Sequence, residues 1–224
     1  SVSTPKQEVP LSMKYVDIPK ASPLHLCTKT IIAYINFQKR IDLEYLFWKI
    51  PIQSYYKPKE GIIKKQIQIT CKTQEHLEAV NQEYERITCR KNSHVIMRVE
   101  KKDKLCSFKH VQKIDIGTSK IDVLSTRKKK MKQKAFYNCF TMVFRVFHKE
   151  QQEFKEIHVK LFNTGKLEIP GITQDSMLFH TLDLLISYIK PYISNENVPL
   201  SYSRDIENVL INMKFNAGFN IKRS

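Results

Sequence analysis

The first hundred residues contain alternating and clustered apolar positions that predict a strand and a short helix. Thr30–Phe37 (TIIAYINF) is rich in β-branched and aromatic residues and partly alternates, which is typical of a strand. Asp42 precedes the apolar stretch 43–48 and Pro51 follows it. We therefore expect a short helix that Asp42 caps and that Pro51 ends. Residues 1–28 contain four prolines, which predict a mostly irregular arm.

The next segment, residues 62–126, has the alternation expected of β structure, with one helical stretch inside it. Thr73 to Arg86 has Leu77, Val80 and Tyr84 at helical spacing. The apolar positions of 94–99 predict a further strand. After it comes the basic run Arg127 to Lys134 (RKKKMKQK), which is either a solvated loop or an arm that contacts phosphates.

A β-hairpin is predicted in the second half of the chain. Phe136–His148 and Phe154–Phe162 are long runs of aromatic and β-branched residues. Asn163–Lys166 (NTGK) follows the second run, and its glycine supplies the positive φ that a tight turn needs. The short strand Leu167–Ile169 then ends at Pro170-Gly171, so the two runs that flank the turn form the hairpin.

The most regular helical pattern extends from Gln174 to Tyr192. Asp175 near its start and Lys190 near its end suit the helix dipole. One face of this helix is apolar: Met177, Leu178, Leu182, Leu184, Leu185 and Ile189. A last strand is predicted at Ile206–Phe215. The order of elements predicts an α+β fold in which the helix covers one face of an antiparallel sheet and leaves the other face free.

Composition narrows the class of function. The 38 Lys and Arg outnumber the 22 Asp and Glu, which gives a formal charge of +16. That charge favours a polyanionic partner such as nucleic acid. The alternative interpretation is that the charge serves only solubility. The five cysteines have no zinc-ligand spacing, the histidines form no HExxH, and no glycine-rich phosphate loop occurs. We therefore expect no metal, no cofactor and no enzymatic activity, and no apolar run is long enough to predict a membrane span.

Three stretches resemble the TATA-binding protein family, in the divergent form found in nucleocytoplasmic large DNA viruses. Residues 31–43 are similar to the opening strand and helix start of the family's first repeat. Leu161–Leu167 (LFNTGKL), with Pro170-Gly171 after it, is similar to the family's hairpin. Residues 206–210, followed by 219–222, resemble the same opening strand at the start of a second repeat. Thr30–Leu43 and Asn208–Lys222 thus echo each other, as expected for a repeated unit.

This resemblance implies a curved antiparallel sheet with helices on its convex face. Residues 1–28 would be an arm, 29–193 the first repeat with a large insertion at about 62–134, and 194–224 a linker and the start of an incomplete second repeat. In the family, the concave sheet lies in the DNA minor groove, and phenylalanines wedge between base steps and bend the duplex. The resemblance therefore implies a transcription initiation factor that binds AT-rich promoter DNA.

Residue by residue, the resemblance assigns Phe162 as one wedge and Phe136 or Phe140 as its partner. Lys166 would contact phosphate, Asn208 would donate to minor-groove acceptors, and Thr30 stands at the family's opening-strand asparagine. Lesser phosphate candidates are Lys160 and Arg145. The implied protein partners are the viral RNA polymerase or other initiation factors. The implied location is intracellular, in the viral factory of the host cytoplasm, with the nucleus and the virion as alternatives.

Two other classes remain open. The first is a non-catalytic scaffold of the viral transcription machinery with weak or no DNA binding, which Glu168 on the DNA-facing sheet favours because a carboxylate repels phosphate. The second is an enzyme or accessory factor of nucleic-acid metabolism that carries a single such repeat. The absence of carboxylate clusters in the sequence argues against the second class.

Overall fold

A computed structural model of the chain describes residues 22–88, 110–124, 138–194 and 198–216. Most of the expected N-terminal arm, the predicted strand at 94–99, Phe136 and the basic run Arg127–Lys134 lie outside these ranges. So do residues 219–222, part of the stretch that resembles a second repeat.

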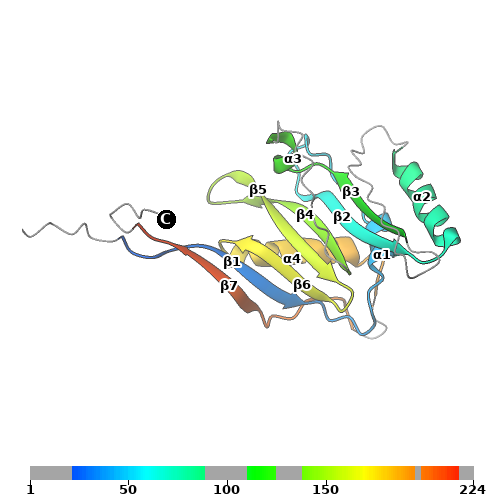
Figure 1. Ribbon diagram of the computed structural model, residues 1–224. Helices are drawn as coiled ribbons and strands as arrows, with labels where there is room; N and C mark the ends of the chain where they lie inside the picture. Colours follow the sequence, from blue (N-terminus) through cyan, green and yellow to red (C-terminus); the bar gives the residue numbers. More distant parts are fainter. Residues whose placement is uncertain (1–21, 89–109, 125–137, 195–197, 217–224) are drawn as a thin grey trace, which may run out of the picture.

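The described residues form one seven-stranded antiparallel sheet (Figure 1). Across the sheet the order is β3-β2-β4-β5-β6-β1-β7. The strand bounds are β1 His25–Tyr34, β2 Gly61–Cys71, β3 His110–Gly117, β4 Cys139–His148, β5 Glu153–Phe162, β6 Lys166–Ile172 and β7 Glu207–Lys214.

Two helices lie against one face of the sheet. Figure 1 is viewed from the other face, so these helices lie behind the strands. Helix α1, Leu43–Lys49, contacts β2 and β4, and the long helix α4, Asp175–Ile189, contacts β4 and β6. Asp42 caps α1 as expected, because its carboxylate accepts the Tyr45 N–H at 2.9 Å. Two further helices are α2, Gln74–Thr88, and the short α3, Lys120–Leu124. The predicted α+β class with an antiparallel sheet is confirmed.

The core lies between the sheet and the helices α1 and α4, and it includes Val80 of α2. One row of directly paired residues crosses six strands on this side, and every member is buried: Ile114, Ile67, Phe140, Leu161, Leu167 and Ala33. Because directly paired residues share a face, this row fixes which side of each strand meets the helices. We call this side the helix face and the opposite side the open face.

Strand bounds differ from the sequence prediction where a neighbouring strand decides them. β1 begins at His25, inside the expected irregular arm, because the stretch from His25 to Ile32 pairs with β7. β6 continues through Pro170-Gly171 to Ile172, and the register of β1 with β6 shifts between Lys29 and Ile31 at that point. Proline has no N–H to donate, and a bulge is one place where a strand tolerates it.

Residues 62–134, which the resemblance assigns to an insertion, contribute strands to the same sheet. β2 lies between β3 and β4 and pairs with both. A bulge between Ile62 and Lys64 shifts the register of β2 against β4. The bulge places Ile62 opposite Phe144 on the helix face and Lys64 opposite Val143 on the open face.

Candidate functional site

The open face has a continuous polar row that crosses the whole sheet. Consecutive direct pairs join one residue from each strand in the order Asp115, Gln66, Thr141, Lys160, Glu168, Ile32 and Glu207. Ile32 is the one apolar member. The row lies one residue along each strand from the buried row of the core, so the sheet is apolar toward its helices and polar on the other side. This contrast makes the open face the candidate site.

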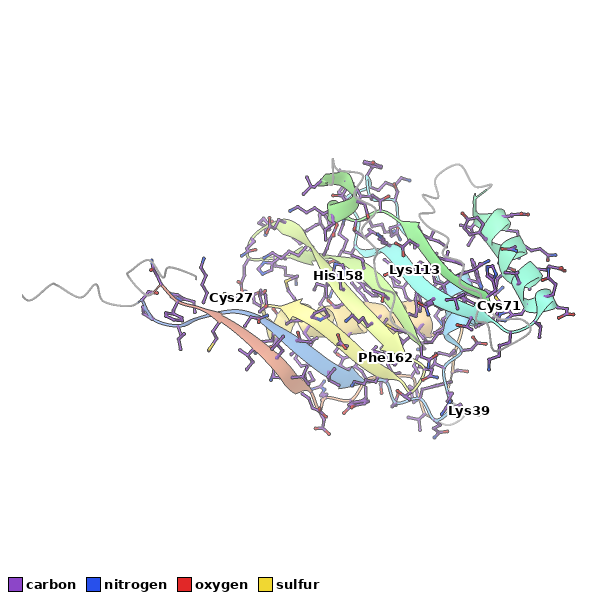
Figure 2. The ribbon with its side chains drawn as sticks, in the orientation of Figure 1. Cys27, Lys39, Cys71, Lys113, His158 and Phe162 are labelled. Atoms are coloured by element: carbon purple, nitrogen blue, oxygen red, sulfur yellow. The ribbon has the colours of Figure 1, made fainter. Side chains whose placement is uncertain are left out.

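Phe162 lies on the open face, at the end of β5. Its neighbour Leu161 is in the core, and successive strand residues point to opposite faces. Phe162 pairs with Cys139 of β4, and its carbonyl accepts the Gly165 N–H at 3.0 Å in the turn that leads to β6. Figure 2 shows it beside this turn, with the sheet between it and α4. The ring is half-buried, and the long helix does not cover it.

Two lysines, an exposed tyrosine and Thr30 lie on the open face together with Phe162. Lys160 pairs with Glu168 through a 2.5 Å ion pair between its Nζ and the carboxylate Oε1. Lys166 opens β6 and pairs with Tyr34 of β1, whose side chain is exposed. Thr30, also on the open face, pairs with Leu210 of β7. The structure therefore brings Phe162, Lys166, Lys160 and Thr30 to one face.

Phe140 is not on that face, and its predicted role as a DNA wedge is wrong. Its side chain is 0% exposed and packs edge-on against Phe47 of α1, with 5.7 Å between ring centroids. A duplex on the open face cannot reach a ring in the core on the far side of the sheet. Phe136, the other candidate partner of Phe162, lies outside the described residues.

Asn208 is on the helix face. It pairs directly with Ile31, whose side chain is part of the core, and paired residues share a face. Its side chain is exposed at the edge of the sheet. A minor-groove contact through the open face is therefore wrong for Asn208.

Arg145 lies on the open face but is only 8% exposed. Its guanidinium donates to the Lys57 carbonyl at 2.8 Å and lies over the Tyr55 ring, 4.7 Å from the ring centroid. Arg145 therefore fixes the loop 51–60 against the sheet, which corrects its prediction as a surface cation for phosphate.

One end of the open face is covered by α3. Lys64 of β2 forms an ion pair with Asp122 of α3 at 2.9 Å, and the Lys120 N–H donates to Glu156 of β5 at 2.7 Å. Ser119 donates to the Asp122 carboxylate through both its N–H and its hydroxyl. Sequence reasoning missed this helix, although Ser119 followed by Asp122 three residues later has the spacing of a capping box.

A cavity of about 700 Å³ opens between α3, the loop 51–60 and β5. Tyr55, Arg145, Phe154 and His158 are among the residues that line it. Burial lowers the pKa of His158, so this imidazole is neutral at pH 7. The cavity and α3 occupy one part of the open face, and Phe162 lies at the other end of β5.

The structure bears on metal ligation and on thiol reactivity only within residues 22–88, 110–124, 138–194 and 198–216. Within these ranges, no group of three or more His, Cys, Asp or Glu side chains could hold a metal ion. Burial raises the pKa of the Cys71 and Cys139 thiols, which keeps them protonated and poorly nucleophilic. Among the same residues, no helix is both long and apolar enough for a bilayer.

Comparisons with protein-family models, with curated proteins and with solved structures gave no match to this chain.

Proposed function

We propose that this protein is a transcription initiation factor of the TATA-binding type, encoded by a large DNA virus, that binds AT-rich promoter DNA in the minor groove through the open face of its sheet. The observation that carries the proposal is the position of Phe162. Its half-buried ring stands on the face opposite α1 and α4, next to Lys166 and the exposed Tyr34.

The pairing of β1 with β7 also supports the proposal. These strands begin the two stretches that echo each other in sequence, Thr30–Leu43 and Asn208–Lys222. They run antiparallel side by side, with Thr30 opposite Leu210 and Ile32 opposite Glu207. Antiparallel neighbours are related by an approximate two-fold axis, which is the relation expected between the opening strands of two repeats that share one platform.

In the proposed mechanism, the Phe162 ring inserts between two base pairs from the minor-groove side. Unstacking costs a few kcal/mol per step, and the larger contact surface of the bent duplex offsets it. TA steps are the easiest to deform, and minor-groove contacts mainly separate A·T from G·C pairs. Lys166 supplies a phosphate contact beside the wedge.

The charge of the open face favours a second candidate function. Two solvent-accessible carboxylates, Glu168 and Glu207, stand in its polar row, and Glu168 engages the ammonium of Lys160. A phosphate backbone gains little from such a row. The alternative is a protein scaffold that binds the viral RNA polymerase or another initiation factor through this face and has weak or no affinity for DNA.

Fluorescence anisotropy with short duplexes tests the proposal. The full chain should bind an AT-rich duplex that contains TA steps more tightly than a GC-rich duplex of the same length. Phe162→Ala should weaken AT-rich binding roughly tenfold or more, since loss of about 1.4 kcal/mol is a factor of ten. The matched control is Phe179→Ala, because Phe179 is an exposed phenylalanine on α4, away from the open face. It should bind within about twofold of the unmodified chain.

The same measurement separates the two candidate functions. Equal, weak affinity for both duplexes, unchanged by Phe162→Ala, would sink the DNA-binding proposal. Glu168→Gln then tests whether the negative charge of this carboxylate is what weakens duplex binding. A gain of affinity on removal of this carboxylate indicates a phosphate path across the row, and no change favours the scaffold.

A further inference from the structure

The last strand, β7, is exposed to solvent on both of its faces. All eight of its residues are exposed, and the apolar side chains are about half exposed: Val209 54%, Leu210 53%, Ile211 50% and Met213 56%. β7 forms one edge of the sheet, and its outer side pairs with no strand in the described ranges. β3, at the opposite edge, has six buried residues of eight.

An edge of this kind is a template for another strand. Unpaired N–H and C=O groups along it can continue the ladder, and natural proteins usually block such edges with charges, prolines or very short strands. β7 is eight residues long, has no proline, and has its only charges at its ends, Glu207 and Lys214. Apolar side chains on both faces add a hydrophobic gain to the pairing.

We propose that β7 pairs with β7 of a second copy of this chain, as antiparallel strands related by a two-fold axis. Directly opposite residues of an antiparallel pair must share a face of the sheet. In a two-fold pair of identical strands this holds only when one residue lies on the axis and therefore pairs with its own copy. With Leu210 on the axis, Val209 lies opposite Ile211 of the other copy, so the apolar residues meet at the centre of the pair. A bulge shifts the register of β7 against β1 between Leu210 and Asn208, and the matched pairing therefore stops short of Asn208.

The charges of the strand also suit this pairing. Antiparallel alignment brings the Glu207 end of one copy to the Lys214 end of the other, so that opposite charges are neighbours at both ends. The whole chain has a charge of +16, so two copies repel each other at a distance. Salt screens that repulsion, and the dimer should therefore become tighter as ionic strength rises.

The two-fold axis of such a pair is perpendicular to the sheet. Both open faces consequently lie on the same side of one continuous sheet of 14 strands, twice the seven of a single chain. Both copies of α4 lie on the other side. This inference does not depend on DNA binding, because it rests on the edge of the sheet alone.

Light scattering coupled to size exclusion tests the proposal, without DNA and at moderate salt. The expected mass is twice 26.4 kDa, about 53 kDa. The double variant Leu210→Lys, Ile211→Lys should be a monomer, since the change at 210 puts two ammonium groups face to face on the axis and the change at 211 puts an ammonium against Val209 of the other copy. The control is Ile121→Lys, Val123→Lys on α3, where the side chains are 64% and 46% exposed. It should keep the dimer.

A crosslink checks the register. In a Cys27→Ser background, which removes an exposed thiol, Leu210→Cys should give an intermolecular disulfide under mild oxidation, and the background protein should not. A monomeric unmodified chain at every accessible concentration and salt overturns the proposal. So does a dimer that survives the Leu210, Ile211 substitutions in a variant whose circular dichroism shows it to be folded.

Discussion

Adjacent residues of this chain have opposite environments, and the sequence reveals this only where apolar and polar residues alternate. In β5, the apolar residues Ile157, Val159 and Leu161 alternate with Glu156, His158 and Lys160, so the pattern places Phe162 on the polar side. In β4 nearly every residue is apolar and eight of ten are buried. Such a strand has no period to read, so its pattern does not show that Phe140 lies on the helix face.

Lys65 is a second residue whose role could not be foreseen. It is 4% exposed on the helix face, and its ammonium donates to the carbonyls of Phe47 and Ile50 at the C-terminal end of α1, the latter at 2.7 Å. Those carbonyls have no partner within the helix, so the lysine completes the end of α1. Burial lowers the pKa of Lys65 from 10.5 to about 8.

This pKa predicts a pH dependence of stability. The folded pKa is below the unfolded one, so between about pH 8 and 10.5 the unfolded chain binds the extra proton and the free energy of unfolding rises with pH. Urea unfolding should show that the free energy of unfolding of the unmodified chain rises with pH across this window. The rise should be larger than in Lys65→Met by up to about 3 kcal/mol. Lys59→Met, at an exposed lysine, should keep the rise. An identical pH profile for Lys65→Met would contradict the burial argument.

Among the elements, those with local signals could be predicted and those defined by a partner could not. Asp42 and Pro51 bracket α1, and the apolar stripe defines α4 to within a few residues. The start of β1 and the end of β6 depend on pairing with β7 and β1, which no local pattern contains. Helix α3 is too short for a periodic signal, and the ion pair of Asp122 with Lys64 holds it in place.

Two glycines near strand ends should differ in how much their replacement by alanine lowers the free energy of unfolding. Gly117 ends β3 with φ +97°, and a Cβ there would lie 2.2 Å from the Ile63 carbonyl oxygen. Gly171 in β6 has a similar φ of +80° but no atom within 4 Å of a Cβ. Gly171→Ala should therefore cost only the backbone strain, about 1–2 kcal/mol. Gly117→Ala should cost clearly more in urea unfolding, because a backbone atom must move. Equal losses would mean that β3 shifts without resistance.

At the scale of the whole molecule, the sequence predicted an α+β fold with one antiparallel sheet, and the described residues confirm it. The sequence predicted helices on one side only, whereas α3 covers one end of the open face. What it could not predict is the place of residues 62–134. An insertion is expected to lie apart, but β2 is an interior strand that separates β3 from β4. Sheet order depends on contacts between distant segments, and the alternating pattern of β2 is compatible with any position in the sheet.

The net charge of +16 predicts that duplex binding falls steeply with salt. A plot of log affinity against log salt concentration should become shallower by about one unit when a single phosphate contact is removed. Lys166→Ala, beside Phe162, should give that change. Lys190→Ala, at the end of α4, should leave the slope as it is. The same slope in all three proteins would show that the duplex does not lie along β6.

Two neighbouring lysines of β2, directly after the bulge at Ile63, make contacts on opposite faces of the sheet. Lys64 binds the carboxylate of Asp122, and Lys65 binds the last carbonyls of α1, on the other side of the sheet. The two short helices are therefore tethered to adjacent positions of a single strand. A shift of β2 by one residue would move Lys64 and Lys65 to the opposite faces and break both contacts at once. The positions of α1 and α3 therefore depend together on the register of β2, although the two helices lie on opposite faces of the sheet.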